Sequence, residues 1–295
     1  MVAEKTSLKS RLIINLFLFL FGGFLLITIK FWPSEKTETS YQLSSMKSED
    51  ITSLKIARGQ MKITMQKQNN IWRINTPFTA RVSEFQLDRI FEILEARSSY
   101  FIDTLDRGDF GLISPDIIIS FNDQTIKFGK INTVTNEQYL ETEGRIFLVP
   151  THLGYSIPNE HSKFISHKIL GEDETPISID FGNWMASQQE NGKWIIKGVL
   201  DSPEEGEIDL SSELLDQWVL GWEMTSSLGT TPYKKNPSGR KIIVTTRSRK
   251  TIEFVINQNE QGYLLIRKDE LMAYQVGHDA GNRLFSPHEI ALSQN

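Results

Sequence analysis

The side chains of this sequence that could carry acid–base or metal chemistry are few and poorly spaced. The chain has five histidines and no cysteine, which excludes disulfides, thiolate metal sites and cysteine nucleophiles. His278 stands beside Asp279, but no partner nucleophile is identifiable for this pair. His161 and His167 are six residues apart and would lie on different faces of a helix. We therefore predict no catalytic residue, no metal site and no cofactor, with a hydrolase centred on His278 and Asp279 left open as an alternative.

The motifs of the common nucleotide-binding and hydrolytic sites are missing. The sequence contains no phosphate-binding loop, dinucleotide-binding turn, zinc-protease helix, calcium-binding loop or nucleophile elbow. The acidic runs 172–174 and 204–207 lack the alternating carboxylates of a calcium loop and are interpreted as solvated linkers. A net charge of -5 disfavours a general nucleic-acid binder, which needs surplus lysine and arginine.

One basic concentration and one tryptophan form the candidate ligand or partner surface. The basic side chains flank a predicted hairpin, and the tryptophan lies in the segment FGNWMAS. The residues are Trp184, Arg240, Lys241, Arg247, Arg249 and Lys250. An anionic lipid or a glycan would suit this set, although hairpin tips are commonly charged to block edge pairing.

An apolar run near the N-terminus predicts a membrane anchor. Residues 12–29 contain only Asn15 and Thr28 as polar side chains, and residues 30–32 extend the stretch to bilayer length. A cleaved signal peptide is the alternative, but no small-residue cleavage site follows the run. Lysines and an arginine before it favour a cytoplasmic N-terminus, which would put the main body in the periplasm. We expect a cytoplasmic tip and transmembrane anchor at 1–32 and a linker at 33–50.

The remainder of the chain predicts two modules of the same design. Short strand-like runs separated by turn residues begin near residue 51, and an amphipathic helix opens with Ser83 as a capping residue. The same order of strands, helix and strands recurs from residue 176. The predicted boundaries are 51–158 for the first module, 159–175 for a connecting helix and acidic joint, and 176–295 for the second module.

Matching positions in the two halves support a tandem duplication. Trp72 corresponds to Trp194 near the end of a strand, and the helix stripe that ends at Leu94 corresponds to the stripe that ends at Trp222. The expected fold class is α+β: an N-terminal transmembrane helix followed by two similar modules, each a mainly antiparallel sheet with one packed amphipathic helix.

Several segments of the first module resemble a known bacterial family. They are Trp72 at a strand end, Pro77 and Ala80 before the helix, FGLISP at 110–115, Phe-Gly-Lys at 128–130 and Gln-Tyr-Leu at 138–140. They are similar to the domain of unknown function 4340 family. The resemblance covers residues 51–150 and extends more loosely to the second half, where a different segment at 228–237 replaces FGLISP. It implies an extracytoplasmic, membrane-anchored protein of the cell envelope and supplies no catalytic residue.

The sequence as a whole favours a binding role. We predict a non-enzymatic, single-pass inner-membrane protein whose duplicated periplasmic module binds a protein partner. We expect this partner to be a membrane complex in which the chain is an accessory subunit, either transporter-like (ABC type) or another envelope complex. The alternative is a periplasmic glycan- or lipid-binding module. Neither a nucleic acid nor a small-molecule substrate is expected as a partner.

Overall fold

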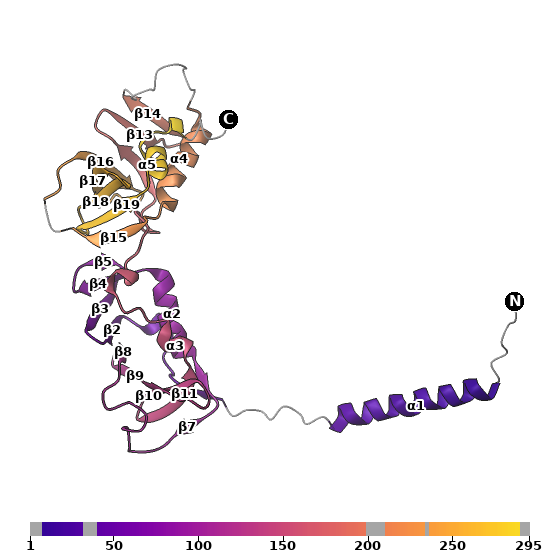
Figure 1. Ribbon diagram of the computed structural model, residues 1–295. Coiled ribbons are helices and arrows are strands. Elements are labelled where there is room, and N and C mark those ends of the chain that lie inside the picture. Colours follow the sequence, from indigo (N-terminus) through magenta and orange to yellow (C-terminus); the bar gives the residue numbers. More distant parts are fainter. Residues whose placement is uncertain (1–7, 32–39, 199–209, 234–235, 290–295) are drawn as a thin grey trace. The chain divides into compact units, whose positions relative to one another are not determined.

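The computed structural model describes residues 8–31, 40–198, 210–233 and 236–289. The chain divides into two compact units, Met1–Ser40 and Tyr41–Asn295. The described part of the first unit is dominated by one helix, α1 (Leu8–Phe31) (Figure 1). Every β-strand among the described residues lies in the second unit.

The expected transmembrane anchor is corrected by the structure. Among the helices in the described part of the chain, none combines the length and apolar character needed to cross a bilayer. The apolar run 12–29 by itself is at the short end of the length range for a span, so the prediction depended on residues 30–32 to reach bilayer length. Trp32, which the prediction used to lengthen the run, lies outside the described residues. The predicted fold class is therefore wrong in assigning a transmembrane helix, and the described chain is mainly antiparallel β-sheet.

The first module of the second unit is built on a nine-stranded sheet, with antiparallel pairing throughout. In spatial order its strands are β5 (Ala80–Arg81), β4 (Ile71–Thr76), β3 (Met61–Gln68), β2 (Ser53–Arg58), β8 (Ile117–Phe121), β9 (Gln124–Ile131), β10 (Glu137–Thr142), β11 (Arg145–Pro150) and β7 (Phe101–Ile102). The module also contains a two-stranded sheet of β1 (Tyr41–Gln42) and β6 (Arg97–Ser98), the helices α2 (Glu84–Glu95) and α3 (His152–Tyr155), and the 3-10 turn η1 (Ser48–Asp50).

The second module is built on an eight-stranded antiparallel sheet. In spatial order its strands are β14 (Trp194–Gly198), β13 (Trp184–Gln188), β12 (Pro176–Asp180), β16 (Arg240–Thr246), β17 (Thr251–Asn259), β18 (Gly262–Arg267), β19 (Met272–Val276) and β15 (Gly229–Pro232). Its helices are α4 (Ser212–Met224) and α5 (His278–Phe285). These helices contact each other, and α5 contacts β18.

The two large sheets share one strand order. The series β4-β3-β2-β8-β9-β10-β11-β7 and the series β14-β13-β12-β16-β17-β18-β19-β15 run through equivalent positions in the chain. Along the chain, the helix α2 comes after β4 and β5 in the first module, and the helix α4 comes after β14 in the second. The described residues differ in one edge strand, because β5 covers the edge of β4 and no described strand covers the edge of β14.

Alternating burial explains why these segments form strands. In β8, Ile117, Ile119 and Phe121 are buried while the residues between them are partly exposed, which is the period of a strand with one face against a core. The turn to β9 begins at Asn122, whose positive φ of 47° suits an asparagine. The hydrophobic side chains of both modules gather into one large buried cluster.

The two long helices of this unit bury the predicted stripes. Leu87 and Leu94 of α2 and their counterparts Leu215 and Trp222 of α4 are all buried. Ser83 is the N-cap residue of α2, as predicted, but its side chain makes no capping hydrogen bond. The Ser83 side chain therefore does not accept a hydrogen bond from a backbone amide of the first turn of α2.

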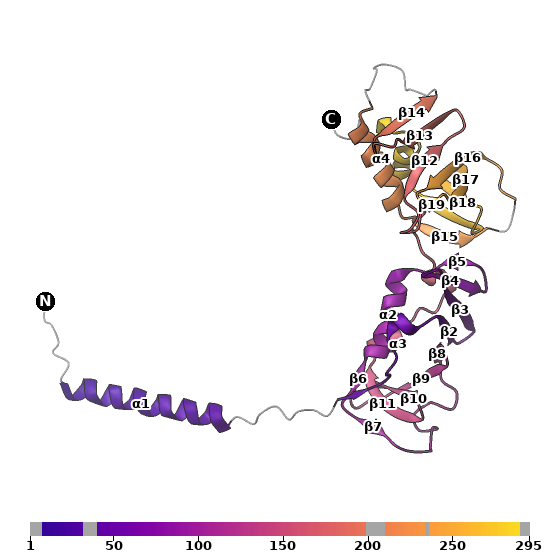
Figure 2. The ribbon, with the colours of Figure 1, turned by 180° about the vertical axis from the view of Figure 1, so that it is seen from behind.

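The segment between the modules is less helical than expected. In place of a longer connecting helix, it has the four-residue 3-10 turn η2 (His161–Phe164). Two isolated bridges continue it, Val82 with Ile165 and Lys168 with Ser226. The reverse view in Figure 2 shows β5 of the first module near β15 of the second, where the chain passes from one module to the other.

Candidate functional site

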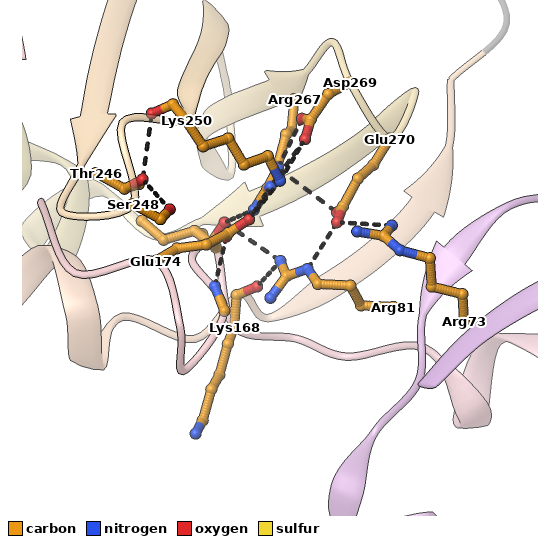
Figure 3. Close-up of polar contacts among 12 residues, drawn as sticks. Arg73, Arg81, Lys168, Glu174, Thr246, Ser248, Lys250, Arg267, Asp269 and Glu270 are labelled. Carbon is orange, nitrogen blue, oxygen red and sulfur yellow. Dashed lines mark hydrogen bonds and ion pairs between the residues drawn. The ribbon is translucent and has the colours of Figure 1, made fainter. Parts of the chain in front are cut away.

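The densest polar constellation of the described chain lies where the two modules meet. Its buried members are Arg81, Glu174, Arg267, Glu270 and Tyr274, and we call them the joint cluster. Figure 3 shows four of them, Arg81, Glu174, Arg267 and Glu270, converging from strand β5, from the segment before β12 and from the β18–β19 hairpin. Sequence reasoning did not identify this cluster.

Arg267 organises the side of the joint cluster that belongs to the second module. Its Nη1 and Nη2 donate to the two carboxylate oxygens of Glu174 at 2.6 and 2.5 Å. Its Nε and Nη2 donate to the two oxygens of Asp269 at 2.8 and 2.9 Å. Two bidentate pairs on one guanidinium use the donor geometry that arginine offers and fix the side chain in place. Lys250 lies at the edge of the joint cluster, where its Nζ is 2.7 Å from the Glu174 carboxylate and 3.1 Å from the Asp269 carboxylate.

Arg81 connects the first module to this cluster. Its Nε donates to the Oε1 of Glu270 at 2.8 Å, and its Nη2 donates to the backbone oxygen of Lys168 at 2.6 Å. The same Nη2 also donates to the Tyr274 hydroxyl at 3.0 Å, and that hydroxyl donates to the other oxygen of Glu270 at 2.7 Å. Arg73 lies 3.6 Å from Glu270 at the partly exposed rim. The carboxylate of Glu270 is therefore bound from both modules (Figure 3).

The electrostatics around Arg267 keep the carboxylates of Glu174 and Asp269 charged. Burial acts to raise the pKa of Glu174, but hydrogen bonds and attraction from Arg267 outweigh it and lower the pKa below its ordinary value. The pKa of Asp269 is lowered in the same way. Burial together with the charge of Glu270 raises the pKa of Tyr274, so this phenol stays protonated.

These groups suit a structural joint better than acid–base catalysis. A general base needs a pKa near the working pH, whereas the pKa values of Glu174 and Asp269 are shifted away from neutrality. Their oxygens are also occupied by arginine and lysine donors. What the arrangement can do is select one orientation of the modules, since breaking a buried ion pair leaves an uncompensated charge.

Trp184 does not belong to an exposed surface. It is 3% exposed, and its ring stacks on Phe181 with centroids 4.1 Å apart and planes at 10°. It also lies against Trp218 of α4, with the ring centroids 5.6 Å apart. The hypothesis that Trp184 is a surface aromatic for a glycan is therefore wrong, because the helix and the strand enclose it.

The structure separates the predicted basic residues into two groups. Arg240 and Lys241 lie at the start of β16, while Arg247, Arg249 and Lys250 lie at its far end in the turn to β17. Lys241 and Arg247 are separated by six residues along this strand, which is roughly 20 Å at the usual rise per residue. The basic residues therefore form no single patch.

The contacts of the basic residues differ between the two ends. The guanidinium of Arg240 lies 5.3 Å from the Phe181 ring centroid, next to buried Trp184, and the Nζ of Lys241 lies 3.5 Å from Glu253. Lys250 belongs to the rim of the joint cluster. Arg247 and Arg249 are exposed.

The remaining chemical candidates are dispersed. His278 and Asp279 begin α5, and the Nε2 of His278 is 3.2 Å from the backbone oxygen of Glu260. The acidic run 172–174 contributes Glu174 to the joint cluster, whereas the run 204–207 lies outside the described residues. In the part of the chain that the structure describes, no three potential metal ligands come together.

Three of the segments that carry the family resemblance, 110–115, 128–130 and 138–140, meet at one place in the first module. The backbone oxygen of Phe110 accepts a hydrogen bond of 2.9 Å from the amide of Lys130, and the Phe110 ring packs edge-on against Tyr139 at 4.9 Å. Gly129 lies directly under this loop, where a β-carbon would come 2.1 Å from the Phe110 oxygen. Gln138 donates to the Gly129 oxygen at 2.9 Å. These residues therefore hold the loop 104–115 against β9 and β10.

The sequence signals for the joint cluster were weak. Arg81 interrupts an apolar stretch between Ala80 and Val82, and Arg267 ends the apolar strand β18 before an acidic turn. A charged residue in such a setting is often buried with a partner. Its partner cannot be identified from spacing, because Arg81 and Glu270 are 189 positions apart.

No family model, no curated protein and no solved structure matches the chain.

Proposed function

We propose that this protein is a non-catalytic binding protein that uses its two modules together to hold a protein partner in a larger complex. The observation that carries the proposal is the joint cluster, in which Arg81 of the first module binds Glu270 of the second in the protein interior. Separate modules joined by a linker normally move relative to each other. A buried, hydrogen-bonded joint instead presents both modules as one surface.

A fixed orientation favours the binding of a large partner. Partner binding has an entropic cost for each element that must be ordered, and a preformed arrangement reduces this cost. Both modules also expose large apolar side chains, with Leu105 97% and Val134 91% exposed in the first and Leu228 74% exposed in the second.

The role that fits these features is that of an accessory subunit in a transporter-like or other envelope complex. A body without a catalytic centre of its own, which offers contacts on two modules, can position a second protein without acting on a substrate. A periplasmic location of the main body belongs to the same proposal, and its direct measurement is protease protection in intact and osmotically shocked cells.

The test is cross-linking of the tagged full chain in its native cells, followed by purification and mass spectrometry. We expect one protein in stoichiometric amount. Arg81→Met is expected to reduce its recovery, while Arg73→Met, which changes a rim residue, serves as the matched control. Recovery of the monomeric chain alone from wild-type cells would overturn the proposal.

A further inference from the structure

A small apolar groove lies between the two helices of the second module. Its volume is about 230 Å³. Buried Trp218 and Leu284 contribute to its lining, and Met224, which is 71% exposed, stands at its side. Gly221 and Ala280 leave space between α4 and α5 because their side chains are minimal.

The first module has a large side chain where this groove has none. Matching Leu94 of α2 with Trp222 of α4, as the buried stripes require, places Ile93 opposite Gly221. Ile93 is fully buried on a helix that packs against α3. A β-carbon added to Gly221 would meet no atom within 4 Å. One aliphatic side chain fills this space in the first module, and the corresponding space in the second module is open.

A positive charge at the rim of the groove indicates a second feature that its occupant should have. Arg283 of α5 is exposed and contributes to the lining, and within the described residues it takes part in no ion pair. A guanidinium beside an apolar cavity is complementary to a carboxylate that flanks an apolar side chain.

We propose that the α4–α5 groove binds an acidic peptide segment of a partner protein, which inserts one aliphatic side chain over Gly221 and pairs a neighbouring carboxylate with Arg283. This inference deepens the proposed function and rests on it, because it names the surface that the partner uses. The exposed side chains of Leu220 and Met224, one helical turn apart on α4, extend the apolar contact beyond the groove.

The probe is a display library of random 12-residue peptides selected on the full chain. We expect the enriched peptides to combine a leucine, isoleucine or valine with a nearby aspartate or glutamate. Gly221→Leu fills the groove and should weaken the best peptide by at least about tenfold, the ratio that corresponds to about 1.4 kcal/mol. Phe85→Ser, at an exposed residue of the other module, is the control and should leave the affinity unchanged.

An exchange of charges between the protein and the peptide distinguishes a specific ion pair from nonspecific apolar binding. Arg283→Glu should weaken the acidic peptide, and replacing the acidic residue of the peptide by lysine should restore binding to this variant. Enrichment of peptides without an aliphatic and acidic pair, or binding that is unaffected by Gly221→Leu in a folded protein, would overturn the groove assignment. If the Gly221→Leu protein still recovers the cellular partner, the groove is not the site that the partner uses, and the proposed function is unaffected.

Discussion

Arg81 and Glu270 form an ion pair of 2.8 Å between the two modules, and their side chains are only 7% and 0% exposed. The arginine comes from a two-residue edge strand, β5, that the second module lacks among its described residues. The glutamate comes from the turn between β18 and β19. In the equivalent hairpin of the first module, the turn is only Glu143 and Gly144. The longer turn of the second module thus supplies the contact with β5.

Arg81→Met is expected to destabilise the protein by about 3–5 kcal/mol, because the Glu270 carboxylate would lose its best partner in a buried site. Unfolding of the second module should then precede that of the first. Four of the five tryptophans beyond residue 40 lie in the second module, so denaturant unfolding followed by tryptophan fluorescence reports mainly on it.

Hydrogen exchange measured on both modules provides the comparison. In the wild-type chain the two modules should become exchange-competent together, and in Arg81→Met they should separate. Arg73→Met removes a contact of 3.6 Å from a partly exposed arginine and should cost only about 0.2–1 kcal/mol. Equal effects of the two substitutions would contradict the central position given to Arg81.

The joint cluster should also make the free energy of unfolding depend on pH. The pKa values of Glu174 and Asp269 are lowered in the folded chain, so at acid pH the unfolded chain binds protons that the folded chain does not. The free energy of unfolding should therefore fall as the pH drops below roughly 4, the ordinary range of these carboxyl groups.

Glu174→Gln tests this dependence. It should be less stable than the wild type at neutral pH, and its stability should change less between neutral and acid pH, because the shifted carboxyl group is gone. The exposed residue Glu49 gives the control Glu49→Gln, which should follow the wild-type curve. Parallel curves for the wild type and Glu174→Gln would show that the Arg267 pair does not govern the acid response.

Local signals explain what sequence reasoning could identify. The repeated order of strands, helix and strands is present in both modules, and α4 buries the predicted stripe, because alternation and helical spacing are properties of neighbouring residues. The joint cluster depends on contacts between distant positions, so no local pattern contains it. The transmembrane prediction was wrong because an apolar composition was read as a full span. Trp184 was misjudged because its burial depends on Phe181 and on α4.

Trp184→Ala should reduce the stability of the protein, because Trp184 is a buried residue of the second module. Removing a large aromatic side chain from a packed core costs about 3–5 kcal/mol. The expected result is a lower denaturation midpoint, measured by circular dichroism. Val134→Ser, at a residue that is 91% exposed, should change stability by no more than about 0.5 kcal/mol. A Trp184→Ala protein as stable as the wild type would contradict the packing of the second module described above.

Gly129 and Gly221 differ in the space that is available to an added β-carbon, and alanine substitutions at both test the loop of the first module. A β-carbon on Gly129 would lie 2.1 Å from the backbone oxygen of Phe110, so Gly129→Ala must displace the loop 104–115 or the strand β9. The expected cost is about 1–3 kcal/mol, with faster proteolysis within the loop. Gly221→Ala adds the same methyl group to open space in a helix and should stabilise the protein by about 0.5–1 kcal/mol. A Gly129→Ala protein that is as stable as the wild type would contradict the close contact of Gly129 with Phe110.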